Sequence, residues 1–388
     1  MKKTFLSVAL ATACAAGCIG AHAAEPGETT IGGRAFVDLT SIDETSNGTK
    51  TDASGIGLDV KRFYFIVGHQ FDKTWSVNLT TDFNYVSNDS ETQLFIKKAY
   101  AEAKFNDKFT LRLGSADTPL LPFLEGIYGY RFIETMVVER IGFESSADWG
   151  AHILGTFGNG KAHYAVSAIN GNGYKNPSRS QSLDLDTRID FSPVKGLTLA
   201  AFYRTGKRGL DKQSVTTLHT ASRTELLAAY SKDKFRVGLE LFQADNWNQV
   251  LSPLSDSSDG HSLWGTFNVK KNVQLFARVD EAKPSKDLAP ALENRYYNLG
   301  VIFTPVSRVD LAVVYKQDKV DGGSLKTSNG TIGATTRIGA LTVNSGGTAT
   351  FSGAIKAASL LSDATGSISV IDPRWSICAR RRKSCFGA

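Results

Sequence analysis

Ionised side chains alternate with apolar ones in parts of this 388-residue chain. In the run Leu183-Asp184-Leu185-Asp186-Thr187-Arg188-Ile189-Asp190-Phe191, every even position carries a charge. Fixed charges of both signs along one face of a strand can line a watery passage and act on passing ions. The chain contains no His-Glu-x-x-His, Gly-x-Ser-x-Gly or phosphate-loop pattern, so electrostatic selection is favoured over catalysis. We therefore expect neither an enzyme nor a cofactor.

A second group of ionisable residues lies in the segment 117–140. Two prolines and two glycines there break regular structure. The apolar pairs Leu120-Leu121 and Phe123-Leu124 predict that the segment folds inward and holds its charges across a passage as a constriction. The alternative is packing on a rim or at a subunit interface. The ionisable residues of the segment are Asp117, Glu125, Arg131, Glu134, Glu139 and Arg140.

These residues need strands to position them. The stretch Trp75–Tyr85 alternates between apolar or aromatic residues and small polar or charged ones, which gives one strand face for each kind. No long segment shows the 3.6-residue period of an amphipathic helix that could cover the apolar face, and no apolar run after residue 20 is long enough for a transmembrane helix. The pattern predicts an all-β fold, an antiparallel transmembrane β-barrel with lipid outside and water inside.

Short turns and longer links alternate along the whole chain, as in outer-membrane barrels. Seven turns and eight links imply sixteen strands, with the last one between residues 319 and 388. The fifteen segments predicted as strands are 31–42, 56–71, 74–86, 92–105, 108–116, 141–157, 161–170, 182–191, 197–206, 222–231, 234–244, 262–269, 272–281, 294–303 and 308–318. Aromatic residues recur near the short turns, where they predict a girdle at the edge of the lipid.

Alternation with lipid-facing neighbours assigns directions to the charged side chains. The cations predicted to face inward are Arg112, Arg188, Arg236, Arg278 and Lys316, while Lys98, Lys104 and Arg204 could face either way. Acidic residues on the same wet faces are Asp82, Asp184, Asp186, Asp190, Glu240 and Asp280. The mixed signs predict a weakly selective pore; the alternative is that the charges pair and only keep the lumen wet.

The N-terminus has the pattern of a secretory signal. Lys2 and Lys3 precede an apolar stretch, and Ala21-His22-Ala23 fits the cleavage pattern, so residues 1–23 are predicted to be removed. Lipoprotein processing at Cys18 is the alternative. The barrel is then expected over 24–373, with 37 basic and 38 acidic residues and no cysteine, before an atypical basic tail, 374–388. This balance argues against binding of nucleic acid through overall charge.

The tail conflicts with a closing strand. Residues Arg380 to Lys383 are four consecutive cations, of which at least two would face lipid at about 2–4 kcal/mol each near the midplane. One hypothesis is a reading-frame shift late in the gene. The other is a tail outside the barrel, with 348–361 as a substitute strand.

Several short motifs occur in the order seen in a known family. They are Lys61-Arg62-Phe63-Tyr64, Lys97-Lys98-Ala99-Tyr100, Gly114 with Pro119 and Pro122-Phe123, Arg131-Phe132-Ile133-Glu134 and Arg140-Ile141-Gly142. In these the chain resembles Gram-negative outer-membrane porins, most closely the phosphate-selective porin O/P type. The resemblance implies a sixteen-stranded barrel, a homotrimer and a third loop folded into the pore. Phosphate selectivity in that family rests on lysine and arginine arrays.

We expect an outer-membrane porin of a Gram-negative bacterium, surrounded by lipid, through which small hydrophilic solutes and ions, phosphate-like anions among them, diffuse passively. A structural or adhesive barrel without a channel and a secreted carbohydrate-binding β-protein are the alternatives. The run Asp256-Ser257-Ser258-Asp259-Gly260 could contact calcium, although such runs are more often polar turns.

Overall fold

The computed structural model describes residues 2–12, 25–84, 93–327, 330–333, 341–343, 348–351, 360–362 and 367–370. They belong to two compact units, Met1–Gly333 and Ala334–Ala388. The strands of the first unit are β1 (Lys2–Thr12), β2 (Thr29–Ser46), β3 (Thr49–Lys50), β4 (Gly55–Gln70), β5 (Trp75–Asn84), β6 (Gln93–Asn106), β7 (Phe109–Asp117), β8 (Ala147–Phe157), β9 (Ala162–Ile169), β10 (Asp184–Phe191), β11 (Leu197–Gly206), β12 (Ala221–Lys232), β13 (Phe235–Asp245), β14 (Ser257–Lys270), β15 (Val273–Lys283), β16 (Glu293–Val306), β17 (Val309–Asp321), β18 (Ser324–Thr327) and β19 (Gly330–Gly333). Its helices are α1 (Leu121–Tyr128) and α2 (Val137–Arg140).

The large sheet closes on itself. It has seventeen strands, one of which is the two-residue β3 beside β2, so sixteen strands form the ring. Every neighbouring pair in it is antiparallel, from β2 with β4 through β9 with β10 to β16 with β17. Strand β1 completes the ring by pairing with both β17 and β2. A closed ring leaves no free sheet edge, which is what a hydrocarbon surround requires.

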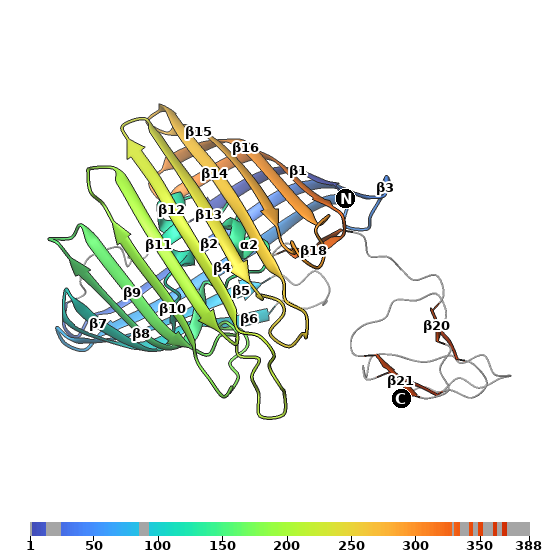
Figure 1. Ribbon diagram of the computed structural model, residues 1–388. Helices are drawn as coiled ribbons and strands as arrows, with labels where there is room; N and C mark the ends of the chain where they lie inside the picture. Colours follow the sequence, from blue (N-terminus) through green and yellow to red (C-terminus); the bar gives the residue numbers. More distant parts are fainter. Residues whose placement is uncertain are drawn as a thin grey trace. The chain divides into compact units, whose positions relative to one another are not determined.

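Each strand presents one face to the outside of the ring. On β13, Val237, Leu239 and Leu241 are exposed, while Gly238 and Glu240 between them are buried. This two-residue period is the signature of a strand with lipid on one side and protein or water on the other. Figure 1 shows the tilted strands of the ring side by side, with α2 visible between its two walls.

The predicted all-β barrel is confirmed, and each of the fifteen predicted strands has a counterpart within a few residues. One prediction was wrong at its start: the strand expected over 141–157 begins at Ala147, because residues 141–146 still belong to the preceding loop.

The sequence also predicted that another part of the chain would supply the sixteenth strand of the ring. The sequence placed a closing strand after residue 318, whereas β1 lies there in the structure. After Lys2 and Lys3, residues 4–12 are uncharged and mostly apolar, which suits a strand in a lipid-embedded barrel.

In the second unit, the described strands are β20 (Leu341–Val343), β21 (Thr348–Phe351), β22 (Leu360–Ser362) and β23 (Ser367–Val370). Each has three or four residues, and they pair in parallel, β20 with β22 and β21 with β23. The basic tail and residues 352–359 of the expected substitute strand lie outside the described residues.

Candidate functional site

The connection from β7 to β8, residues 118–146, lies inside the ring and is called the inner loop here. It holds α1 and α2, and its apolar residues are almost completely buried, among them Leu120, Leu124, Ile133 and Val138. Burial of these side chains against the inner wall supplies the free energy that holds the loop in place. The segment predicted to fold inward therefore does so, with helical turns that its sequence did not suggest.

Local sequence determines where α1 begins and ends. Pro122 lies in its first turn, where the missing N–H costs no helical hydrogen bond. Gly129 ends the helix in the left-handed region at φ +82°, and its N–H donates to the Glu125 carbonyl at 2.8 Å. A Cβ atom at position 129 would also lie 3.0 Å from the Arg236 guanidinium. The left-handed backbone therefore favours glycine at this position, and a larger residue would also have to displace the end of the Arg236 side chain.

Cations from the barrel wall bind the backbone of the inner loop. They come from strands distributed around the ring, so they tie the loop to several parts of the wall at once. The contacts to carbonyl oxygens are Arg188 to Pro119 at 3.0 Å, Arg236 to Ile127 at 3.0 Å, Arg278 to Thr135 at 2.7 Å, and Lys316 and Lys61 to Ile133 at 2.5 and 3.4 Å. Hydrogen bonds from charged donors are the stronger kind, at about 1.5–3 kcal/mol each.

Arg140 of α2 makes the reverse contact, from the loop to the wall. Its side chain is fully buried and donates to Asp280 at 3.2 Å, Asp318 at 3.0 Å and Asn294 at 2.8 Å. Its guanidinium also lies 4.5 Å from the centre of the Tyr296 ring. A buried charge with this many partners fixes α2 against β15, β16 and β17.

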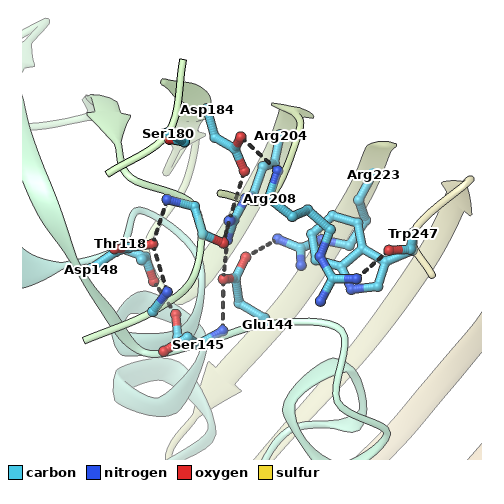
Figure 2. A network of polar contacts seen from close by, with 12 residues as sticks. Thr118, Glu144, Ser145, Asp148, Ser180, Asp184, Arg204, Arg208, Arg223 and Trp247 are labelled. Carbon is cyan, nitrogen blue, oxygen red and sulfur yellow. Dashed lines mark hydrogen bonds and ion pairs between the residues drawn. The ribbon is translucent and has the colours of Figure 1, made fainter. Parts of the chain in front are cut away.

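Glu144 is the residue at the end of the loop that sequence reasoning missed. It accepts hydrogen bonds from Arg204 at 2.6 Å and from Arg223 (Figure 2). The carbonyl of Phe143 also accepts a hydrogen bond from Arg223. Arg204 in turn pairs with Asp184 at 3.0 Å. The wrong strand assignment over 141–157 hid this role; Gly142 and the pair Ser145-Ser146 were the breakers that could have revealed it.

On the other side of the inner loop, the charged side chains are partly open. Except for the fully buried Asp82, their side chains are between about a tenth and a quarter exposed, whereas those of Arg140, Arg204 and Arg223 described above are at most 3% exposed. The ion pairs are Arg131 with Glu125 at 2.5 Å and Glu139 at 2.9 Å, Arg62 with Asp82 at 2.9 Å, Lys98 with Asp117 at 2.6 Å, and Arg112 with Glu102 at 2.6 Å. This side combines loop residues with the wall from β4 to β7.

Two β-bulges concentrate cations on this wall. Phe36 and Val37 of β2 pair with Arg62 and Val60, so Lys61 is an extra residue. Thr80 and Thr81 of β5 pair with Lys98 and Ile96, so Lys97 is extra. A bulge shifts the alternation by one residue and lets two consecutive side chains share a face. Lys61 with Arg62, and Lys97 with Lys98, therefore all have inward contacts.

A closed sixteen-stranded ring with an inner loop is the architecture that the sequence resemblance implied. The model of the Gram-negative porin family matches residues 9–339. The chain belongs to this family. No curated protein matches the chain.

Two solved structures show how this porin compares in fold. OmpT of Vibrio cholerae, expressed in the outer membrane, is 11% identical, with 86% of this chain and 92% of that one covered and a TM-score of 0.51. The outer membrane channel DcaP of Acinetobacter baumannii is 12% identical, with 86% and 93% covered and a TM-score of 0.50. At these identities the likeness concerns the fold. Family membership places the porin in the outer membrane of a Gram-negative bacterium.

The structure divides the predicted site residues of this porin into two groups. Asp117, Glu125, Arg131 and Arg112 lie together on the partly open side. Glu134, Arg278 and Lys316 lie inside the ring too, but they are 4%, 1% and 3% exposed between loop and wall, so they do not face open water as expected. The cause is the inner loop, which covers that wall.

The remaining predicted cations lie at intermediate depth or at the ring's edge. Arg188 and Arg236 are partly exposed and bind the loop backbone. Of the three whose direction was open, Lys98 and Arg204 point inward, while Lys104 is exposed and pairs with Asp107 at 3.0 Å. The wet-face acids named from the sequence are all buried inside the ring: Asp82, Asp184, Asp186, Asp190, Glu240 and Asp280.

The electrostatics of the inner loop are set by its wall partners. Burial alone would raise the pKa of Glu134, but the ammonium groups of Lys316 and Lys61 and the guanidinium of Arg140 outweigh burial and hold this pKa below its ordinary value. The Lys316 Nζ atom is 3.5 Å from the Glu134 carboxylate. Glu134 is therefore ionised at neutral pH and completes the contact between loop and wall.

Two further observations concern the described part of the chain only. No group of three or more His, Cys, Asp or Glu side chains there could hold a metal ion. In the predicted calcium segment, Asp259 pairs with Lys286 at 2.6 Å. Among the same described residues, no helix combines the length and apolar character needed to cross a bilayer.

Proposed function

We propose that this porin is a passive diffusion channel whose passage runs between the inner loop and the wall formed by β4 to β7. Porin family and fold support a general porin. The observation that supports the narrower proposal is the asymmetry of the loop. One side is packed against β15 to β17 through the buried side chains of Arg140, Arg278 and Lys316. The other side carries the partly exposed ion pairs of Arg131 and Arg62.

Pairing of the charges supports weak selectivity. Each of Arg62, Lys98, Arg112 and Arg131 has a carboxylate within 3.0 Å. A pair of opposite charges has a weak field at the distance of a passing ion. Small hydrophilic solutes of either sign are therefore the proposed cargo.

A modest preference for anions, phosphate-like ones included, is the finer proposal, and Lys97 favours it. Among the residues that the structure describes, Lys97 has no carboxylate at ion-pair distance; its Nζ atom lies 3.4 Å from the Tyr64 hydroxyl and 4.7 Å from the centre of that ring. Lys175 lies over the Phe95 ring at 4.5 Å. Cations whose charge is not neutralised by a carboxylate attract anions.

A liposome swelling assay with uncharged sugars of increasing size tests the channel directly. Vesicles with folded porin should swell in small sugars and stop above a size limit, while vesicles with heat-denatured protein should not swell. Absence of swelling with folded, membrane-inserted protein would favour the structural or adhesive barrel. A protein recovered in the periplasm or medium would favour the secreted carbohydrate binder.

The homotrimer that the resemblance implies is likewise a proposal. The outward surface of the barrel carries exposed apolar residues on β2 and on each strand from β4 to β17, among them Leu263, Leu299 and Val313. Mass determination of the detergent-solubilised protein by light scattering should give three chains. A single chain at micromolar concentration would remove this part of the proposal.

A further inference from the structure

The connection from β9 to β10 reaches to the wall that bounds the proposed passage. It comprises residues 170–183 and is one of the longer links, which face the outside of the cell in outer-membrane barrels. Within it, the Tyr174 hydroxyl donates to the Asp82 carboxylate at 2.7 Å. Asp82 lies near the end of β5, beyond β6, β7 and β8 in the ring. A side chain of this link therefore spans three neighbouring strands at the outer mouth.

The backbone at Tyr174 is fixed to the start of β8. The Asp148 carboxylate accepts hydrogen bonds from the N–H groups of Gly171 and Gly173, each at 3.0 Å. Both glycines are in the left-handed region, at φ +92° and +74°. The indole of Trp149 donates to the Tyr174 carbonyl at 3.1 Å. With the main chain held in this way, the side-chain torsions of Tyr174 decide whether its ring stays at the wall.

The Tyr174 ring helps to cover a cation of that wall. The Lys97 Nζ atom lies 5.9 Å from the centre of this ring and 4.7 Å from the centre of the Tyr64 ring, and Lys97 is only 6% exposed. The Nζ atom of Lys175 lies 5.8 Å from the same Tyr174 ring. Within the described part of the chain, neither ammonium group has a carboxylate at ion-pair distance. When the ring turns away, both charges would attract an anionic group.

The hydrogen bond to Asp82 is what holds the ring in this place. Its acceptor is itself fixed, because Asp82 is fully buried and also pairs with Arg62 at 2.9 Å. Hydrogen bonds from a hydroxyl to a carboxylate are among the stronger ones. We propose that Tyr174 is a selectivity-determining residue: its ring closes the outer mouth over Lys97, and its release gives anionic solutes access to Lys97 and Lys175. This inference rests on the proposed passage along β4 to β7.

Cysteine labelling on intact cells tests the cover over Lys97. The full chain carries Lys97→Cys, with its four native cysteines replaced by Ser. The probe is a membrane-impermeant methanethiosulfonate with a sulfonate group. Addition of Tyr174→Phe should raise the labelling rate about tenfold, the effect of one hydrogen bond to a charged acceptor. The Phe variant leaves Asp82 paired with Arg62, so it creates no unpaired carboxylate. The control is Tyr164→Phe, which removes an equally short hydrogen bond, 2.7 Å to the Lys108 carbonyl, at the short-turn edge.

Equal labelling rates with Tyr174 and Tyr174→Phe overturn the inference, and so does an equal rise with Tyr164→Phe, because the barrel is then loosened in general.

Reversal potentials provide a second test with Lys97 in place. At 0.1 M salt, Tyr174→Phe should raise the anion-to-cation permeability ratio about twofold, because ions come closer to the ammonium group. The double variant with Lys97→Gln should lose most of this rise, and a rise that persists in full overturns the role of Lys97. Vesicles that swell in small sugars while labelling is unchanged overturn only this inference, whereas vesicles that do not swell overturn the channel itself.

Discussion

Replacement of Lys97 by glutamine should reduce the anion preference of the channel. The side chain has an inward contact because of a bulge, and no described carboxylate lies at ion-pair distance from it. The Lys97 side chain is only 6% exposed. A passing ion is therefore placed at about 7 Å from its charge, where one charge contributes roughly 0.6 kcal/mol in water. Screening over about 10 Å at 0.1 M salt lowers this to roughly 0.3 kcal/mol, favourable for an anion and unfavourable for a cation, which together give about a threefold change in the anion-to-cation permeability ratio. At 1 M salt, with a screening length of about 3 Å, the change should be less than about twofold.

Reversal potentials across a planar bilayer under a salt gradient measure this ratio. Lys104→Gln is the matched control, because Lys104 is a lysine of the same strand that is 54% exposed in its side chain and paired with Asp107 near a turn. It should leave the ratio unchanged. Equal ratios for wild type and Lys97→Gln at 0.1 M salt, or an effect that does not shrink at 1 M, would refute the reasoning.

Three further changes follow from the same geometry. Arg112→Cys should react with a water-soluble thiol reagent in folded protein and Arg278→Cys should not, since their wild-type side chains are 22% and 0% exposed; equal labelling rates would contradict the placement of the loop. Lys316→Met should destabilise the barrel by about 3–5 kcal/mol in denaturant titrations, because it leaves Glu134 with a buried charge, and Lys316→Met with Glu134→Gln should recover part of the loss. The pKa of Glu134 is lowered in the folded protein, so its contribution to the free energy of unfolding is present above the unfolded pKa of about 4.3 and is lost as pH falls through the lower folded value. Glu134→Gln should therefore weaken the loss of stability at acid pH. An unchanged loss of stability at acid pH in this variant would exclude the role.

The positions of the strands and the directions of their side chains were predictable, because successive side chains of a barrel strand alternate between lipid and the interior. Apolar and polar positions alternate, and turns punctuate them, so β13 or β15 could be placed within two residues. The inward direction of Arg112 followed from the same rule. Local pattern was sufficient because each strand has the same two environments along its length.

The bulges could have been read from the sequence but were not. The outward series of β4 changes from Ile56 and Leu58 at even positions to Phe63 and Phe65 at odd ones. That change of phase marks an extra residue between them, Lys61. The motifs quoted for the family resemblance contained both bulges, but only the pairing register explains why two cations stand together.

The inner loop's helices could not be predicted from local pattern. α1 has eight residues and α2 four, too short to be stable alone. They form because the wall buries their apolar side chains and binds their carbonyl oxygens. For the same reason, the sequence could not show that Arg278 faces the back of the loop instead of the open passage.

The most direct test of the account is the single-channel conductance of a porin with a shortened inner loop. Removal of about ten residues from the middle of the 118–146 segment, with Pro119 and Arg140 retained, should raise conductance, because Glu125 and Arg131 of this segment bound the proposed passage. A deletion of similar kind in the link 284–292 is the control and should leave conductance unchanged. Unchanged conductance in a correctly assembled inner-loop variant would contradict the claim that this loop narrows the channel.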